Sequence, residues 1–308
     1  MPDLSWEERP QTDNEELLRL VAEGEIDLTV ANSNEVTLNR RFYPELRVAF
    51  NLTEAQPLAW VFPADRDDSL YRSARDFFGD IKDNGTLHQI LERYYGHARR
   101  LDYVGTRTFL RHIEERLPRF QAAFESAAAA QGLDWRLLAA IGYQESHWNP
   151  RAKSPTGVRG LMMLTQKTAG QLGVDNRLDP EQSIMGGAEY LKGVRDRVPQ
   201  RIPEPDRTWM ALAAYNVGFG HLEDARKLTQ SQDGDPDKWV DVMKRLPLLS
   251  QRKYYIHTRH GYARGHEPVQ YVQNVRSYYD ILVWYTDRAR DRERPATNPP
   301  YDILPPAL

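Results

Sequence analysis

The hydrophobic pattern of this 308-residue chain changes near residue 108, and this change most limits how the chain can fold. Before it, short runs typical of strands are mixed with helical runs. After it, apolar residues recur almost throughout at the spacing of amphipathic helices. The sequence therefore predicts an α/β part followed by a mainly α part, and an α+β fold for the chain as a whole.

The first part, residues 1–107, mixes two kinds of local pattern. Apolar side chains at helical spacing predict helices over residues 13–23, 70–78 and 87–95. Alternating or extended apolar runs predict strands over residues 26–30, 46–52 and 58–62. Three strands are too few for a complete α/β domain, so this part is expected to be a piece of one.

The second part, residues 108–293, is expected to be almost entirely helical. Gly132 is predicted to end one helix, and Asp134 to cap the start of the next. The predicted helices cover residues 111–130, 135–145, 166–172, 181–194, 209–215 and 269–284. Residues 294–308 hold five prolines without periodicity, which predicts an extended tail.

Composition excludes several classes of function. A net charge of -3 gives no reason to expect a nucleic-acid partner, because phosphate binding needs a concentrated basic surface. The chain has no cysteine, and its eight histidines show no metal-ligand spacing, so no metal or cofactor is expected. No apolar run is long enough to span a membrane, and residues 1–13 are polar and acidic, unlike a secretory signal. If the native protein is exported, this chain is expected to have lost the segment that exported it.

Glu145 is the strongest catalytic candidate. It lies at the end of an apolar predicted helix that Pro150 is expected to stop, between Tyr143 and Trp148. Burial among such aromatic side chains raises the pKa of a carboxyl, as a general acid needs at neutral pH. A glycosidic bond is therefore the expected target if the aromatic residues form a sugar-binding groove.

The usual glycosidase uses two carboxylates, one on each side of the scissile bond. After Glu145, no Asp or Glu occurs before Asp175, although a distant residue such as Glu267 is able to fold back. A single carboxyl suits a reaction in which the substrate supplies its own nucleophile. It first protonates the leaving oxygen and then removes a proton from a hydroxyl of the same sugar.

Four motifs occur in order in the second part: Glu145-Ser146, Gly160-Leu161-Met162, Ala214 to Gly218, and Tyr271-Val272. With these motifs, residues 118–285 resemble the Slt-type, goose-lysozyme-like catalytic domain of lytic transglycosylases. The resemblance implies a mainly α lysozyme-like domain that cleaves the MurNAc–GlcNAc bond of peptidoglycan and leaves 1,6-anhydroMurNAc, with glycan strands as its partner. It implies that Glu145 is acid and base, and that the residues contacting substrate are Ser146, Met162, Tyr215, Asn216, Glu267 and Tyr271.

Two positions depart from the pattern of that domain. Met163 stands where Gln is common, which removes one polar group from the expected groove. Pro268 stands where Thr is usual, so the backbone next to Glu267 is expected to differ.

Residues 14–96 resemble the last part of a periplasmic solute-binding domain of the amino-acid type. The resemblance rests on residues 24–28, 58–61 and 83–87. It implies a truncated regulatory module with weak or no solute binding in this chain, and a muropeptide effector for the full-length protein. A periplasmic location peripheral to the outer membrane is also implied, by family alone.

Two other functions fit the same residues. One is a muramidase that uses water, and the other is a non-catalytic module that senses muropeptide or grips glycan. Lys153, Arg159 and Lys167 either attract an anionic glycan or form a solvated face. Structural roles are expected for a further set: exposed loop positions for His147, His257, Arg259 and His260, and core positions for Tyr278 and Tyr279.

Overall fold

The computed structural model describes residues 6–63, 67–96, 103–154 and 157–293. The chain divides into two compact units, which are described separately. The first comprises residues 1–88 and 101–107, and the second residues 89–100 and 108–308. The second unit thus begins at the change of pattern near residue 108 and also takes in residues 89–100. The proline-rich tail falls outside the described residues.

The first unit is built from short helices. Asp13 caps α1 by accepting a hydrogen bond from the backbone N–H of Glu16 at 2.8 Å, and Asn14 donates from its side-chain amide to Glu35 at 2.9 Å. A small buried cluster consists of Leu18, Leu20, Phe42, Tyr43 and Leu46. The helices are α1 (Asn14–Ala22), α2 (Ser33–Asn39), α3 (Ser69–Asp83), the start of α4 (Thr86–Tyr95) and the start of α5 (Tyr103–Glu115).

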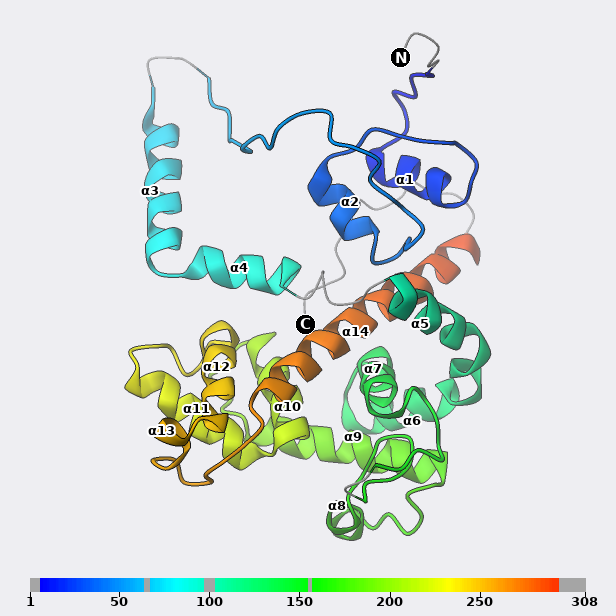
Figure 1. Cartoon of the computed structure of the whole chain (residues 1–308), viewed down its shortest axis with the longest axis vertical. Coiled ribbons are helices and arrows are strands. Elements are labelled where there is room, and N and C mark those ends of the chain that lie inside the picture. Colours follow the sequence, from blue (N-terminus) through cyan, green and yellow to red (C-terminus); the bar gives the residue numbers. More distant parts are fainter. Residues whose placement is uncertain (1–5, 64–66, 97–102, 155–156, 294–308) are drawn as a thin grey trace. The chain divides into compact units, whose positions relative to one another are not determined.

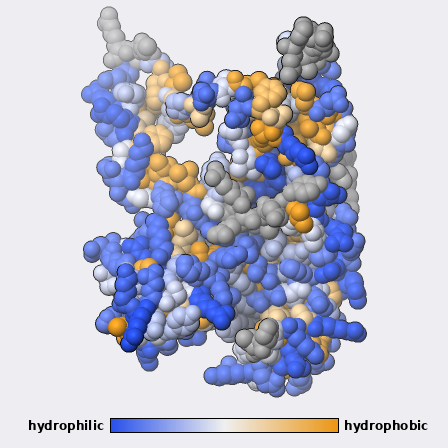
Figure 2. Space-filling model, in the orientation of Figure 1, coloured by the Kyte–Doolittle hydropathy of each residue, from blue (hydrophilic) through white to orange (hydrophobic). Residues whose placement is uncertain are grey.

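The strands predicted for the first part are wrong, because the described residues contain no strand there. Alternation makes a segment suitable for a sheet, but a strand exists only where a neighbour pairs with its backbone. Most apolar side chains of the three segments remain exposed, although Leu46 is buried; Leu58 and Val61, for example, are 93% and 92% exposed. Figure 2 accordingly shows apolar surface over α3 and around α1 and α2. The predicted α/β lobe is therefore not present as a sheet in the described residues, which are mainly helical.

The described part of the second unit is mainly helical. Figure 1 shows its longest helix, α14, passing alongside α7 and α10, and both pairs are in contact. The elements are α6 (Gln121–Gln131), α7 (Trp135–Ser146), α8 (Gln166–Gln171), α9 (Pro180–Arg197), α10 (Asp206–Val217), α11 (Phe219–Ser231), α12 (Trp239–Arg245), α13 (Arg252–Tyr255), α14 (His266–Glu293) and the 3₁₀ turns η1 (Leu117–Arg119) and η2 (Leu246–Ser250).

One long helix predicted over residues 111–130 is wrong, because the chain breaks it into α5, η1 and α6. Pro118 lies in the break. Proline has no backbone N–H and its ring collides with the preceding turn, so a helix does not continue through it. The predicted boundary at Gly132 is confirmed, since this residue ends α6 with a left-handed φ of 63°.

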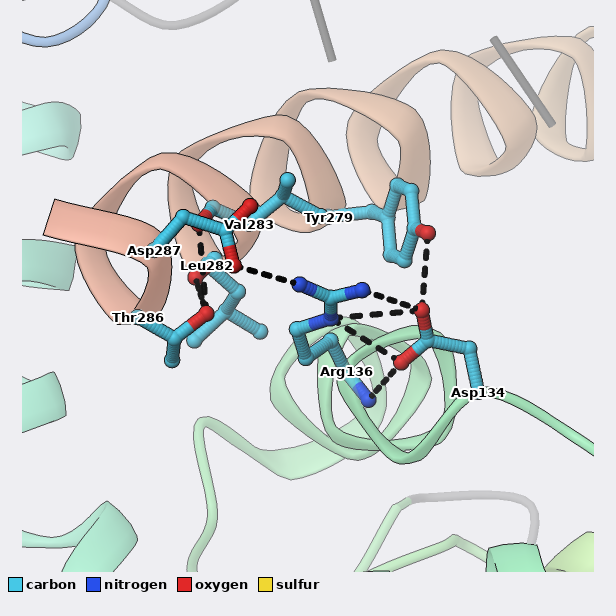
Figure 3. Close-up of polar contacts among 7 residues, drawn as sticks. All are labelled: Asp134, Arg136, Tyr279, Leu282, Val283, Thr286 and Asp287. Carbon is cyan, nitrogen blue, oxygen red and sulfur yellow. Dashed lines mark hydrogen bonds and ion pairs between the residues drawn. The ribbon is translucent and has the colours of Figure 1, made fainter. Parts of the chain in front are cut away.

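Asp134 joins the start of α7 to α14, as Figure 3 shows. Its carboxylate caps α7 through the N–H of Arg136 at 2.8 Å and accepts a hydrogen bond from the Tyr279 hydroxyl at 2.9 Å. The Arg136 guanidinium binds Asp134 at 2.8 Å and Asp287 of α14 at 3.2 Å. Burial opposes ionisation of Asp134, but its bonds to Arg136 and Tyr279 hold the pKa of this carboxyl below its usual value.

The core of the second unit lies where α6, α7, α9, α10 and α14 pack together. Leu138, Ile141, Leu161 and Met210 are among its fully buried side chains. Tyr278 and Tyr279 are buried too, which confirms the prediction that they belong to the core. Within the described ranges no helix is both long and apolar enough to cross a membrane.

Candidate active site

Glu145 lies in the last turn of α7, and the backbone after it is unusual. His147 and Trp148 both have left-handed conformations, with φ of 52° and 56°. The helix therefore ends at Ser146, before Pro150 is reached. The Trp148 indole donates to the carbonyl of Ala139 at 2.8 Å, so the chain turns back along the helix it has just left. Left-handed residues other than glycine are costly, and packing of this kind holds them in place.

The carboxyl of Glu145 faces Tyr271 of α14. The Tyr271 hydroxyl donates to Oε1 of Glu145 at 2.7 Å. Burial raises the pKa of Glu145 to about 7, and the hydrogen bond from Tyr271 opposes part of that rise. No ionised side chain among the described residues contributes to this pKa. The group is thus divided between its acid and its carboxylate near neutral pH.

Three tyrosine side chains contact one another in a row that starts at this carboxyl. Tyr271 is stacked on Tyr215 of α10, with ring centroids 6.3 Å apart and planes 18° apart. Tyr215 meets Tyr190 of α9 edge to face at 5.1 Å. Burial, and the charge of Glu145 after it, raise the pKa of both Tyr215 and Tyr271, so these phenols stay protonated as hydrogen-bond donors.

The prediction that Tyr143 and Trp148 enclose Glu145 does not hold for their rings. Tyr143 packs against Phe109, Trp148 and Tyr278, with centroids 4.4, 4.7 and 4.8 Å away, and its hydroxyl is 2.9 Å from His112. Residues two apart on a helix do not face each other, so Tyr143 and Glu145 serve different surfaces of α7.

The turn over residues 160–164 is fastened to the end of α7. The Ser146 hydroxyl donates to the carbonyl of Leu161 at 2.7 Å and approaches that of Gly142 at 3.1 Å. The carbonyl of Met162 accepts a hydrogen bond from the Tyr215 hydroxyl at 3.2 Å. The N–H of Met162 donates to the Ser183 hydroxyl at 3.1 Å. The Ser146 hydroxyl is therefore engaged by backbone, and the Met162 side chain is fully buried.

Gly160 begins this turn at a position that no other residue fills. Its φ is +86°, and a Cβ built there lies 1.7 Å from the carbonyl oxygen of Arg177. Met163, where the related domain commonly has Gln, also has a left-handed φ of 50°. The Gly160-Leu161-Met162 motif thus specifies a tight backbone turn beside the carboxyl.

The structure brings together five of the residues predicted from sequence, through the contacts given above: Glu145, Ser146, Met162, Tyr215 and Tyr271. Asn216 is exposed at the end of α10, next to Tyr215. Glu267 is 59% exposed one turn before Tyr271 and pairs with Arg264 at 3.3 Å. Its charge is not among the causes that shift the pKa of Glu145.

Sequence reasoning missed Tyr190 and Ser183. Both lie on α9, where one packs on Tyr215 and the other receives the N–H of Met162. An isolated tyrosine or serine in an amphipathic helix gives no local signal of such a role. Only the packing of α9 on α10 reveals it.

The basic residues near the turn have different surroundings. Arg159 is exposed and lines a pocket of about 380 Å³ together with Gln166, Asp175 and Arg177. The Arg177 guanidinium is used internally, because it donates to the carbonyls of Gly157 and Leu164 at 3.1 and 2.9 Å.

We predict that Tyr271→Phe raises the pKa of Glu145. The change removes the hydroxyl that stabilises the carboxylate and leaves the ring that encloses it. A ¹³C NMR titration of the Glu145 carboxyl measures the effect, with Tyr278→Phe as the control in the separate core cluster. An unchanged titration midpoint in Tyr271→Phe contradicts the prediction.

Comparison with known proteins gives one family model and close relatives. Residues 122–238 match the transglycosylase SLT domain. The membrane-bound lytic murein transglycosylase F of Hahella chejuensis is 50% identical over 327 residues, covering 100% of this chain and 64% of that protein. The protein of the same name from Marinobacter nauticus is 57% identical over 281 residues, covering 91% of this chain and 56% of that protein.

Among solved structures, the chain is similar to the 70 kDa soluble lytic transglycosylase Slt70 of Escherichia coli. The identity is 25% and the TM-score 0.42, covering 59% of this chain and 27% of the other. The chain spans 64% and 56% of the length of the two relatives named above. Within the part of those proteins that it spans, the chain is similar to membrane-bound lytic murein transglycosylase F, and its residues 122–238 match the transglycosylase SLT domain.

Proposed function

We propose that this protein is a peptidoglycan lytic transglycosylase with Glu145 as its single acid and base. It cleaves the β-1,4 bond between MurNAc and GlcNAc without water and leaves 1,6-anhydroMurNAc ends. The observation that carries the proposal is an enclosed carboxyl with a pKa of about 7, held by one tyrosine hydroxyl. The SLT domain and the names of the relatives support the same reaction.

In the first step Glu145 donates its proton to the oxygen of the leaving GlcNAc while the bond from that oxygen to C1 of MurNAc breaks. The carboxylate then takes the proton of the C6 hydroxyl of the same MurNAc, and its oxygen bonds to C1. The acid is restored and no water is consumed. A pKa near the working pH suits a group that must both give and accept a proton.

Tyr271 is proposed to orient the acid. Its bond occupies Oε1 of Glu145, and Oε2 has no hydrogen-bond partner among the described residues. The second oxygen is therefore the one that meets the glycosidic oxygen. Tyr215, Asn216 and Glu267 are proposed to contact the sugars, whereas Ser146 and Met162 act through the turn that they hold beside the acid.

The main rival is a muramidase that uses water. A retaining glycosidase needs a second carboxyl about 5 Å from the first, and an inverting one needs it about 6.5 to 9.5 Å away. A carboxylate so close raises the pKa of its neighbour, and no such contribution acts on Glu145 from the described residues. The second rival is a module that binds glycan without cleaving it. Binding alone does not require an enclosed carboxyl with a pKa of about 7.

Mass spectrometry of the products released from purified sacculi tests the proposal. We expect muropeptides that are lighter by one water than those of a muramidase digest, and no ¹⁸O uptake when the reaction is run in H₂¹⁸O. Products that carry ¹⁸O at the reducing end favour the muramidase. Binding to sacculi with no product released favours the non-catalytic module.

The remaining proposals concern regulation and location. Residues 1–107 are proposed to derive from a solute-binding lobe, and the longer protein to respond there to a muropeptide. A periplasmic site at the outer membrane is consistent with relatives named as membrane-bound. Adding muropeptide to this chain and finding unchanged turnover contradicts an effector site within it.

A further inference from the structure

A basic segment precedes α14. Between Asp241 and Glu267 the chain has no acidic residue, although its net charge is -3. Arg252 and Lys253 of α13, and Arg259 and Arg264 of the following loop, are all exposed. We call these four residues the basic surface. Figure 2 shows hydrophilic surface over the region of α11 to α13.

The loop that carries this surface is anchored from beneath. Asp224 of α11 is 2% exposed and accepts the backbone N–H groups of Arg259 at 3.2 Å and His260 at 2.8 Å. Ala263 donates its N–H to the carbonyl of Leu249 at 3.1 Å. Gly265 approaches the carbonyl oxygen of Leu246 so closely that a Cβ would lie 1.6 Å from it. The backbone is fixed, so the basic side chains start from defined positions.

Most of the charged groups of the basic surface have no acidic partner among the described residues. Arg252, Lys253 and Arg259 form no ion pair with the described residues, and Arg264 pairs with the exposed Glu267 at 3.3 Å and interacts with Tyr262. Tyrosine rings lie among them: Lys253 stands over Tyr254 at 4.8 Å, and Tyr255 packs edge to face on Tyr262 at 5.7 Å. Planar guanidinium groups bind carboxylates with two parallel hydrogen bonds, which a cation engaged elsewhere cannot offer.

The surface lies close to the acid along the chain. The loop ends at His266, the first residue of α14, and Tyr271 follows five residues later, a rise of about 7.5 Å in a helix. Tyr271 itself holds Glu145. The loop that carries Arg259 and Arg264 therefore leads directly into the helix that holds Tyr271 against the acid.

We propose that the basic surface binds carboxylates of the peptide stems on the glycan strand being cut. The inference rests on the proposed function, because it takes peptidoglycan as the substrate. The stems carry free carboxylates and project from the sugars, so they are the part of the strand that unpaired arginines would recognise. An anionic lipid surface fits less well, because insertion needs an apolar face and Ile256 is the exposed aliphatic side chain among residues 252–264.

The test compares Arg252→Gln/Arg259→Gln with the control Arg111→Gln/Arg119→Gln. The control removes two exposed arginines from α5 and η1, and so changes the net charge equally. Initial rates are measured on strands with stems and on strands stripped by an amidase, each of whose MurNAc residues keeps its lactyl carboxylate. For Arg252→Gln/Arg259→Gln we expect KM on stem-bearing strands to rise about 3- to 10-fold, since two exposed ion pairs are lost. We expect kcat, and KM on stripped strands, to stay within about twofold of the wild type.

An unchanged KM, an equal rise on both substrates, or the same rise in the control overturns the inference. Loss of binding to phosphatidylglycerol vesicles with unchanged KM assigns the surface to lipid and overturns it too. Sedimentation with intact and amidase-treated sacculi measures binding without turnover. If the wild type releases no product, the proposed function fails, and weaker sedimentation of the variant with intact sacculi alone still supports the stem site.

Discussion

Glu145→Gln is expected to lower the rate of glycan cleavage by about 100- to 10,000-fold, the usual worth of a positioned acid–base group. The amide has nearly the shape of the carboxyl, and its oxygen can still accept the bond from Tyr271. It has no proton to give at neutral pH and cannot take one from the C6 hydroxyl. Both steps of the proposed reaction are therefore lost while the fold is kept.

The measurement is the initial rate of product release from purified sacculi. Glu114→Gln is the matched control, because Glu114 is an exposed glutamate of α5. Sacculus-lysing activity retained by Glu145→Gln sinks the catalytic assignment. In the wild type, the proton-donating step is expected to slow as pH rises through about 7, the pKa of Glu145. This decline moves to higher pH in Tyr271→Phe, because loss of the hydroxyl raises that pKa.

Trp148→Ala is expected to reduce the free energy of unfolding of the second unit by about 3 to 5 kcal/mol. The Trp148 side chain is 1% exposed, packs against Phe109 and Tyr143, and gives its indole N–H to Ala139. Its removal leaves a cavity under the end of α7 and removes the hydrogen bond from the indole to the carbonyl of Ala139. It also removes the packing that holds the left-handed backbone directly after the acid.

Urea unfolding followed by circular dichroism measures this loss. Trp6→Ala is the control, because Trp6 is 78% exposed and its removal is expected to change stability by no more than about 0.5 kcal/mol. A loss below about 1 kcal/mol for Trp148→Ala contradicts this prediction. It would mean that neighbouring side chains fill the space left by the indole.

Local chemistry made much of the second unit predictable. Asp134 and Gly132 mark helix boundaries through a cap and a left-handed turn, and both effects act within a few residues. The break at Pro118 is equally local, but the apolar spacing that predicts one long helix continues through it. The strands of the first part failed for a different reason, since pairing depends on a neighbour that alternation within one segment cannot supply.

In the candidate active site, too, features set by neighbouring residues were predictable and features set by distant residues were not. Glu145 was identifiable because the residues around it form a motif. Its contact with Tyr271 joins positions 126 apart in sequence, and the stacking of Tyr271 on Tyr215 depends on how α10 and α14 cross. Tyr143 was misassigned because nearness in sequence was taken for nearness in space.

The link between Asp134 and α14 has a consequence for the chemistry at the other end of the same helices. Along α7, Asp134 is about 16 Å from Glu145, and along α14, Tyr279 is about 12 Å from Tyr271. The two helices are thus joined at two points, which fixes both their tilt and their register. Because the pKa of Asp134 is lowered, the far joint persists until pH falls well into the acid range and is lost below it. Loosening the far joint would change the length of the hydrogen bond from Tyr271 to Glu145, and the pKa of Glu145 would change with it. The pKa of Glu145 therefore depends on how α7 and α14 are aligned.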